Sequence, residues 1–329
     1  MDKAIKVWLM RQAGRYLPEY QKLRKKEKNF MKLCLNPKLA CNISLQPIRR
    51  FNFDFIILFS DILVIPHALG QDVQFKEQVG PVLGELEHKK IKVDLTKNME
   101  KLAAVFETIK LIKKQERDKD LIGFCGGPFT VLNYMIEKGT SKTHKKIMNH
   151  IKNQPDTSAQ LIDIITEVSI EYLKKQIDSG VDFIKVFDSW AGLLDGDDYH
   201  KFVTEPNKKI AQEIKKYSPE TKQIFFPRGS NENFLTFIKE VKPDVIALDE
   251  KFPEGVLSYA KKHNIILQGN LSPRLLVEGG TKLREGIKNI LNIFQGNKHI
   301  FNLSHGVLPQ TPIENVETVV KEIKNYNEA

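Results

Sequence analysis

Eight short apolar segments recur along the chain, and each is followed by a longer amphipathic segment. Most of them are continuously hydrophobic, which is typical of strands that are covered on both faces of a parallel sheet. A repeat of eight strands and helices favours a closed (β/α)8 barrel, with its active site at the carboxyl ends of the strands, over an open sheet. The predicted strands are Lys6–Met10, Phe53–Phe59, Leu121–Cys125, Asp182–Phe187, Gln223–Phe226, Asp244–Leu248, Asn264–Gln268 and His299–Leu303.

The segments between these strands show helical periodicity. In Gln160–Ser179, apolar residues recur at spacings of four, three and four, and Gly180 is placed to end the helix. The last helix is predicted to open at Thr311–Glu314, with a capping box and a proline in its first turn. Two stretches exceed the minimal strand–helix unit, and we expect an excursion over Gln71–Leu95 and a short extra helix within Ser141–Pro155.

Nothing in the sequence divides the chain, so residues 1–329 are predicted to form one domain. The first strand begins close to the N-terminus, and we expect the chain to be short there. No apolar stretch approaches the roughly 20 residues of a membrane span, and the start lacks the pattern of a signal peptide. The three cysteines show no paired spacing, which argues against a disulfide framework or a zinc ribbon. These features predict a cytoplasmic protein.

The net charge of +10 does not indicate nucleic-acid binding. Of 51 basic residues, nine are arginines, which leaves 42 lysines, and these are dispersed along the helical segments. A dispersed lysine excess is typical of a solvated surface, whereas a nucleic-acid footprint clusters on one face. Five of the nine arginines fall in the first fifty residues. This distribution favours an acidic small-molecule ligand.

Every predicted strand ends at a polar or ionisable side chain, although the strands themselves carry little charge. In a barrel of this kind the carboxyl ends of the strands and the loops after them carry the chemistry. The groups after the eight strands are, in order, Arg11 and Arg15; Ser60 and Asp61; Thr130 and Tyr134; Asp188 and Ser189; Arg228; Asp249; Asn270; and Ser304 and His305. We therefore predict one polar site built from all eight strand ends.

The segment after the first strand is suited to binding an anion. Arg11 and Arg15 are separated by the small or polar residues Gln12, Ala13 and Gly14, so two guanidinium groups and backbone N–H groups can converge on one point. Arginine stays charged and holds carboxylates through two parallel hydrogen bonds. The alternative is that both arginines form surface salt bridges.

With these residues assembled, the chain resembles the uroporphyrinogen decarboxylase family, whose members are (β/α)8 barrels. The resemblance extends in order over residues 7–309. It rests on the segments WLMRQAGRYLPEY, LQPIRRFNFDFIILFSDIL, PHALG, FCGGPFTVLNYMIE, VFDSWAGLL, QGNLSP and FNLSHGVLP. The chain departs from the family pattern at Ser272, where an aspartate is expected, at Glu250, where a tryptophan is expected, and at Glu137–Gly139, where glycines are expected.

The resemblance implies a reaction and the assembly that carries it out. Four acetate side chains of uroporphyrinogen lose carbon dioxide and become methyl groups, which yields coproporphyrinogen in haem and porphyrin biosynthesis. No metal or organic cofactor is implied, and the family implies a homodimer whose active-site clefts face each other. The chemistry of the residues agrees, because a substrate with eight carboxylates requires an electropositive site.

The resemblance also implies roles for individual residues. Asp61 is the candidate to accept the pyrrole N–H groups and to stabilise a cationic intermediate; its alternative is a salt bridge to Arg11 or Arg50. Tyr134 is expected to orient Asp61 or the reacting acetate. The predicted substrate-binding groups are Arg11, Gln12, Ala13, Gly14, Arg15, Asp61, Tyr134, Ser189 and His305, and the predicted catalytic groups are Asp61, Arg11 and Tyr134.

Two other functions remain open at this point. A zinc-dependent, corrinoid-linked methyltransferase shares this barrel, but it needs histidine and cysteine ligands near the later strand ends, and no cysteine follows Cys125. A non-enzymatic binding protein for acidic tetrapyrroles would use the same arginines. The combination of Arg11, Asp61 and Tyr134 favours an enzyme over such a binding protein.

Overall fold

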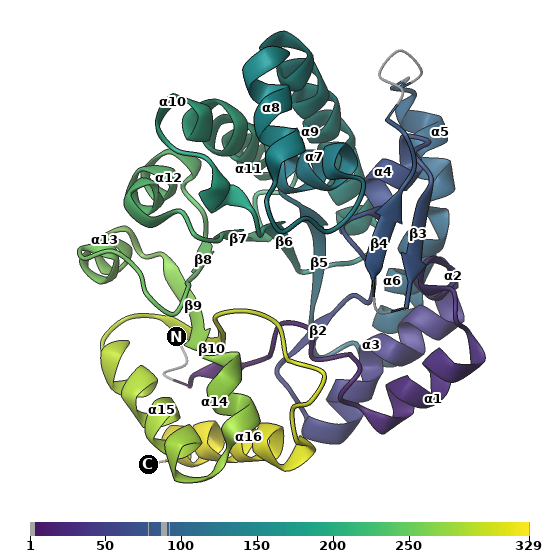
Figure 1. Ribbon diagram of the computed structural model, residues 1–329. Helices are drawn as coiled ribbons and strands as arrows, with labels where there is room; N and C mark the ends of the chain where they lie inside the picture. Colours follow the sequence, from purple (N-terminus) through teal and green to yellow (C-terminus); the bar gives the residue numbers. More distant parts are fainter. Residues whose placement is uncertain (1–3, 78, 87–90, 92, 329) are drawn as a thin grey trace.

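The computed structural model describes residues 4–77, 79–86, 91 and 93–328. Eight parallel strands form one sheet in the order β1-β10-β9-β8-β7-β6-β5-β2, and helices surround it (Figure 1). The (β/α)8 prediction is confirmed. The strands of this sheet are β1 Lys6–Val7, β2 Phe55–Ile57, β5 Asp120–Gly126, β6 Phe183–Asp188, β7 Lys222–Pro227, β8 Val245–Ala247, β9 Ile266–Leu271 and β10 His299–Leu303.

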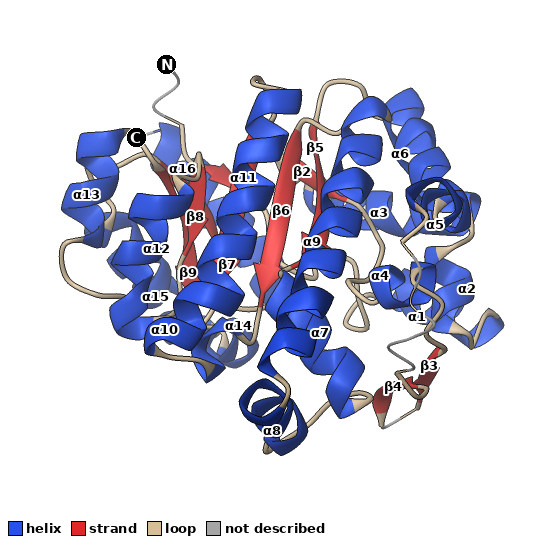
Figure 2. Ribbon diagram, turned by 90° about the horizontal axis from the view of Figure 1, so that it is seen from above, coloured by secondary structure: helices blue, strands red, loops and turns tan. Residues whose placement is uncertain are grey.

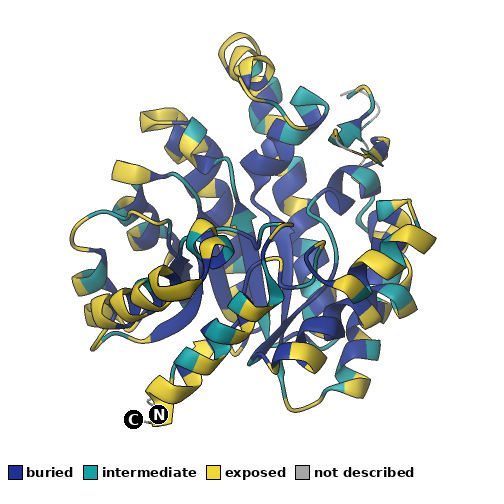
Figure 3. Ribbon diagram, turned by 60° about the horizontal axis from the view of Figure 1, so that its bottom comes forward, coloured by how far each residue is buried: buried dark blue, intermediate teal, exposed yellow. Residues whose placement is uncertain are grey.

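The helices cover the outside of the sheet, and their buried stripes face the strands while their exposed faces point outward (Figure 3). They are α1 Pro18–Lys26, α2 Phe30–Cys34, α3 Pro37–Phe51, α4 Val64–Ala68, α5 Leu95–Lys101, α6 Ala103–Gln115, α7 Pro128–Glu137, α8 Lys145–Asn153, α9 Pro155–Asp178, α10 Gly196–Tyr199, α11 Glu205–Tyr217, α12 Phe234–Val241, α13 Val256–His263, α14 Pro273–Glu278, α15 Gly280–Ile293 and α16 Ile313–Glu328. Within the described residues, no helix is both long and apolar enough to span a membrane.

The barrel is closed between β1 and β2 by a main-chain hydrogen bond together with side-chain contacts, without a strand ladder. The Val7 N–H donates to the Asp54 carboxylate at 2.6 Å, and the Asp54 N–H donates to the Val7 carbonyl at 3.0 Å. Further along, the buried Gln12 amide donates to the Phe55 carbonyl at 3.0 Å and accepts from the Leu9 N–H at 3.2 Å. We refer to these contacts as the β1–β2 seam.

All eight predicted strands exist, but several bounds differ. The first was predicted over Lys6–Met10, whereas β1 ends at Val7. Trp8 and Met10 remain buried, and the Met10 N–H donates to the Asn302 side chain at 2.9 Å instead of to a neighbouring strand's backbone. The chain leaves the sheet here because it turns back at Arg11, whose φ of 60° no strand can accommodate.

The insertions and helix ends also test the predictions. The excursion after β2 contains an antiparallel hairpin, β3 Val73–Lys76 and β4 Gly80–Leu83, although part of Gln71–Leu95 lies outside the described residues. The extra helix in Ser141–Pro155 is α8. The long helix predicted over Gln160–Ser179 begins earlier, at Pro155, because proline is accepted in the first turn. Gly180, with φ of 111°, follows its end as predicted.

The capping box predicted at Thr311–Glu314 is wrong. The last helix begins at Ile313, after the proline, and the buried Thr311 hydroxyl has no hydrogen-bond partner within the described residues. The Thr311 N–H instead donates to the Leu308 carbonyl at 3.0 Å. Thr311 therefore belongs to the turn that closes the preceding loop, and its hydroxyl does not cap the helix.

Candidate active site

The carboxyl ends of the strands lie together on one side of the barrel. In Figure 2 the arrowhead of β6 points toward the side on which α8 and the β3–β4 hairpin protrude. Side chains that follow four different strands meet there: Arg11 after β1, Asp61 after β2, Arg228 after β7 and His305 after β10. The charge of Arg11 lowers the pKa values of Asp61 and His305, and the charge of Arg228 lowers that of His305, as described below. The four side chains are therefore electrostatically coupled.

Asp61 is a half-buried carboxylate held by the backbone. Its Oδ1 accepts a hydrogen bond from the Leu63 N–H at 2.9 Å. Burial raises the pKa of Asp61 from 3.8 to about 6, against the Leu63 N–H and the Arg11 charge, which both lower it. The alternative in which Asp61 pairs with Arg50 is wrong, because both Arg50 Nε and Nη2 bind the Glu19 carboxylate at 2.9 Å.

Tyr134 lies on α7 within electrostatic reach of Asp61. Burial raises the pKa of Tyr134, the Trp190 side chain lowers it, the negative charge of Asp61 raises it and the Arg11 charge lowers it. The structure therefore brings together the three side chains predicted to be catalytic, although they come from segments that are far apart in the sequence.

Arg11 adopts a backbone conformation that favours glycine. It occupies the third position of a turn in which the Gln12 N–H donates to the Leu9 carbonyl at 2.9 Å, and its φ is 60°. Its exposed side chain passes directly over Gly306, where an added Cβ would lie 2.3 Å from Arg11 Cδ. A non-glycine residue in this conformation is strained, and such strain is concentrated at functional sites.

The residues after Arg11 do not all meet the expectation. Gln12 is fully buried, its N–H is already donated to Leu9 and its side chain belongs to the β1–β2 seam. The backbone N–H of Gln12 is therefore not available to a ligand. Ala13 and Gly14 are half-buried, and no described residue accepts their backbone N–H groups. The Arg15 side chain is exposed.

Ser189 follows β6 directly and is half-buried. The preceding residue, Asp188, has both carboxylate oxygens bound by neighbouring side chains. It accepts from the Thr130 hydroxyl at 2.6 Å and from the Asn207 side chain at 2.9 Å, and it is almost fully buried. The two neighbours therefore have different environments, and Ser189 is the one with a solvent-accessible surface.

His305 is half-buried beside two arginines. Burial and the positive charges of Arg11 and Arg228 lower the pKa of His305 from 6.5 to about 4. At neutral pH the His305 imidazole is therefore uncharged, so it can offer a hydrogen bond but no positive charge to a carboxylate.

Sequence reasoning missed Lys185 in the middle of β6. It is fully buried, and its Nζ lies 5.0 Å from the Trp8 ring, 4.7 Å from the Phe187 ring and 5.5 Å from the Phe226 ring. Among the described residues its amine has no hydrogen-bond partner. Burial lowers the pKa of Lys185 well below 10.5. The feature of the sequence that could have revealed Lys185 is a lysine inside an otherwise apolar strand segment.

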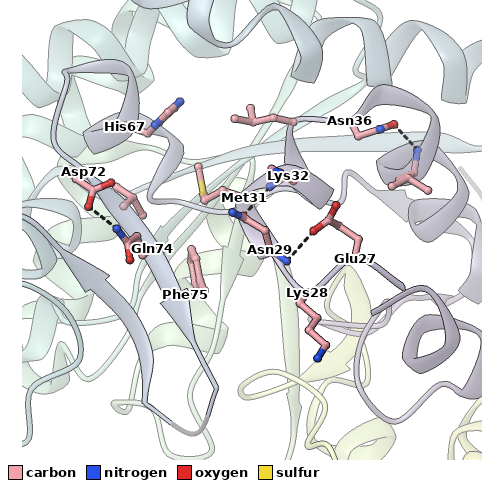
Figure 4. Close-up of a pocket in the computed structure, with 13 residues that line it drawn as sticks. Glu27, Lys28, Asn29, Met31, Lys32, Asn36, His67, Asp72, Gln74 and Phe75 are labelled. Carbon is pink, nitrogen blue, oxygen red and sulfur yellow. Dashed lines mark hydrogen bonds between the residues drawn. The ribbon is translucent and has the colours of Figure 1, made fainter. Parts of the chain in front are cut away.

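A groove of about 860 Å³ lies outside this site, beside α2 and the β3 strand. Figure 4 shows Asp72, Gln74 and Phe75 on one side of it and Met31 and Lys32 on the other. None of the residues predicted for the active site lines it.

The fold and the cluster together define a class of protein: a (β/α)8 enzyme with a carboxylate of raised pKa among cationic side chains at the strand ends. The sequence pattern described as "Uroporphyrinogen decarboxylase (URO-D)" matches residues 3–326. The uroporphyrinogen decarboxylases of Rickettsia bellii and Rickettsia massiliae are 44% and 42% identical to the chain. Each alignment covers 99% of the chain, and 96% and 95% of the relatives. The chain belongs to the uroporphyrinogen decarboxylase family.

Solved structures support the fold alone. A methyltransferase from Methanosarcina mazei superimposes with a TM-score of 0.78 at 20% identity, over 98% of this chain and 94% of that one. A B12-independent methionine synthase from Shewanella gives a TM-score of 0.57 at 12% identity, over 99% of this chain and 95% of that one. At these identities the likeness carries no information about activity.

Proposed function

We propose that the chain removes carbon dioxide from the four acetate side chains of uroporphyrinogen and leaves methyl groups, so that coproporphyrinogen is formed. The observation that supports this most is the position of Asp61, a carboxylate with a pKa of about 6 within electrostatic reach of the Arg11 charge and of the Tyr134 hydroxyl. The sequence pattern of the family also matches the chain over nearly its whole length.

The reaction needs a place for the electrons of the broken carbon–carbon bond. A pyrrole supplies it once a ring carbon is protonated, because the ring then becomes a cationic, iminium-like electron sink. An ionised Asp61 would accept the pyrrole N–H groups and stabilise this positive charge. Stabilisation by a preorganised charged group is commonly the largest single term in catalysis. The electron sink belongs to the substrate, so the proposed reaction requires no cofactor.

The cationic side chains are proposed to hold the carboxylates of the substrate. Arg11 and Arg15 would bind them through charge-assisted hydrogen bonds, and the N–H groups of Ala13 and Gly14 are additional donors. Ser189 and the uncharged His305 would contribute neutral hydrogen bonds. Tyr134 is proposed to orient Asp61 or the reacting acetate. Gln12 is assigned instead to the β1–β2 seam, where its amide is already bonded.

The setting of this activity is part of the proposal. We propose a homodimer that acts in the cytoplasm in haem and porphyrin biosynthesis and that binds neither nucleic acid nor membrane. The dispersed lysines support a solvated surface more than a nucleic-acid footprint. The mass of the native protein, measured by light scattering, tests the oligomeric state.

The methyltransferase alternative is less well supported. Within the described part of the chain, one group of three possible metal ligands was found: His200, Glu205 and Glu240. The Lys208 amine already pairs with both carboxylates, at 3.0 and 3.3 Å. The three cysteines are buried on separate elements, α2, α3 and β5. Stoichiometric zinc in the purified protein would nevertheless favour this alternative.

The decisive experiment incubates the purified protein with uroporphyrinogen under anaerobic reducing conditions, with and without a chelator. Products are oxidised to porphyrins and separated by their number of carboxyl groups. The proposal expects stepwise loss of four carboxyl groups that the chelator does not affect. Binding of the porphyrin without any loss of carboxyl groups would identify a non-enzymatic binding protein instead.

A further inference from the structure

A hydroxyl at the start of α7 connects two strand-end loops. Thr130 is fully buried, and its Oγ1 donates to the Asp188 carboxylate at 2.6 Å and accepts from the Trp190 backbone N–H at 2.9 Å. The carboxylate of Asp188 can only accept, and a backbone N–H can only donate, so the direction of both bonds is fixed. Both hydrogen bonds of the Thr130 hydroxyl are therefore made with the end of β6 and the loop that follows it.

Asp188 is itself anchored on its other side. The Asn207 side chain on α11 donates to its Oδ2 at 2.9 Å and also to the Val203 carbonyl at 2.8 Å. Gly127, which precedes α7, leaves no space for a side chain here, because an added Cβ would lie 2.2 Å from Asp188 Cγ. The start of α7 is therefore packed directly on the Asp188 carboxylate, and the two elements cannot shift independently.

Trp190 is bound to the face of α7 that also carries Tyr134. Its backbone N–H donates to Thr130, and Tyr134 lies four residues further along the same helix face, where the Trp190 side chain lowers its pKa. The His144 ring packs against the indole, with 4.3 Å between the ring centroids. His144 is itself held by the contact between its Nδ1 and Asn133 Oδ1 at 2.9 Å. Trp190 is thus held by its backbone hydrogen bond to Thr130 and by the packing of its ring on His144.

From these contacts we propose that Thr130 is a positioning residue, which sets Trp190 against Tyr134 and so fixes the Tyr134 hydroxyl relative to Asp61. Thr130 does not touch the reacting atoms. The inference rests on the proposed function, because it assigns the Tyr134–Asp61 pair to the decarboxylation site. It deepens that function by extending the catalytic unit to the Asp188–Thr130–Trp190 contacts.

The test compares three variants. Thr130→Val removes the hydroxyl at nearly constant volume, and Thr130→Ser retains it. The matched control is Thr166→Val, which removes another buried hydroxyl whose single bond, to the Ile162 carbonyl at 2.6 Å, lies within α9. For each folded variant we measure kcat and KM with uroporphyrinogen, and the fluorescence emission of Trp8 and Trp190, which all the variants retain.

We expect Thr130→Val to lose about tenfold or more in kcat with KM within about twofold of wild type, since misplacement of a catalytic group acts mainly on turnover. Its emission spectrum should change, because the neighbourhood of Trp190 changes. Thr130→Ser should restore both, and Thr166→Val should alter neither. Equal kcat values in Thr130→Val and Thr166→Val would overturn the proposal, as would a failure of serine to rescue.

Two further measurements separate the inference from its premise. If wild type does not decarboxylate the substrate, the proposed function fails, and the emission of Trp190 then decides the positioning role alone. If Thr130→Val folds poorly, the Asn207→Ala variant replaces it, because it removes the other support of Asp188. Unchanged emission in that folded variant would also count against the proposal.

Discussion

The Arg11 side chain occupies the space that Gly306 leaves free, with Arg11 Cδ 2.3 Å from the point where a Cβ at Gly306 would lie. The first and the last strand ends of the barrel are therefore fitted to each other. A glycine after β10 is what allows an arginine after β1 to reach across the strand ends, beside His305 and toward Asp61.

Gly306→Ala is expected to weaken substrate binding without unfolding the protein. The added methyl group displaces the flexible end of an exposed arginine, which costs little stability, but the guanidinium loses its position. We expect KM to rise by about tenfold, the equivalent of one charge-assisted hydrogen bond, with an unchanged melting temperature. The control is Gly286→Ala on α15, whose Cβ would meet the apolar side chains of Leu275 at 2.9 Å and Leu271 at 3.3 Å, neither of which is predicted to bind substrate. Equal KM values in the two variants would contradict the prediction.

Arg11→Gly separates function from stability at the strained turn. Glycine relieves the left-handed backbone at φ of 60°, which costs an L-residue roughly 1–2 kcal/mol, but it adds freedom to the unfolded chain. The free energy of unfolding should therefore stay within about 1 kcal/mol of wild type, while kcat/KM falls strongly. Urea denaturation and the decarboxylation assay measure the two effects. A large loss of stability would show that Arg11 is needed for folding.

Asp61→Asn is expected to lose about 100- to 1000-fold in turnover, the range seen when one preorganised electrostatic group is removed. The amide oxygen can still accept the Leu63 N–H, so the fold should persist. Burial disfavours the charged form of this carboxyl, so the variant should also melt at a higher temperature at neutral pH. Asp120→Asn, at the opposite end of the barrel, where Asp120 pairs with Lys6, is the matched control. Near-normal turnover in Asp61→Asn would remove Asp61 from the central role.

The pH profile should report the same carboxyl. Asp61 must be ionised to stabilise a cation, and its pKa of about 6 lies above the ordinary 3.8. Activity should therefore fall about tenfold per pH unit below pH 6. His305, with a pKa of about 4, stays neutral across this range. Arg11 lowers the pKa of Asp61, so in Arg11→Gly the residual activity should decline at a higher pH. A profile centred near pH 4 would disagree with this assignment.

Lys185→Met should stabilise the protein and flatten its pH dependence. The folded protein holds this amine neutral well below pH 10.5, whereas the unfolded chain binds a proton there. The unfolded state thus binds more protons, so wild-type stability should rise with pH up to about 10.5. Methionine removes this cost, and we expect a gain of about 1 kcal/mol or more at pH 7. The control is Lys110→Met on the exposed side of α6. A loss of stability would indicate that the rings around Lys185 favour its charged form.

The barrel could be predicted because each strand is a local apolar run, and a run is visible without knowing its neighbours. The strand ends followed for the same reason, so Arg11, Asp61, Tyr134 and His305 were identifiable. The exact bounds of β1 were not, because they depend on the turn at Arg11 and on a hydrogen bond to Asn302, nearly three hundred residues away.

Contacts between residues that are far apart in the sequence could not be predicted from it. Thr130 and Asp188 lie 58 residues apart, and their contact follows no periodicity. The structure accounts for two of the departures from the family pattern. Ser272 caps α14 through the Arg274 N–H at 3.3 Å, as an aspartate can, and Lys138 ends α7 with φ of 60°, where glycine is usual.

The β1–β2 seam has a consequence for how this barrel can change over evolution. Seven junctions between strands are fixed by main-chain ladders, but the eighth has the main-chain bond from Asp54 to Val7 and otherwise depends on the side chains of Asp54 and Gln12. It lies between the strand that leads to the arginines and the strand that leads to the carboxylate. A few mutations at the seam could slide one relative to the other, and so tune the spacing between anchor and reaction centre while the rest of the scaffold stays rigid.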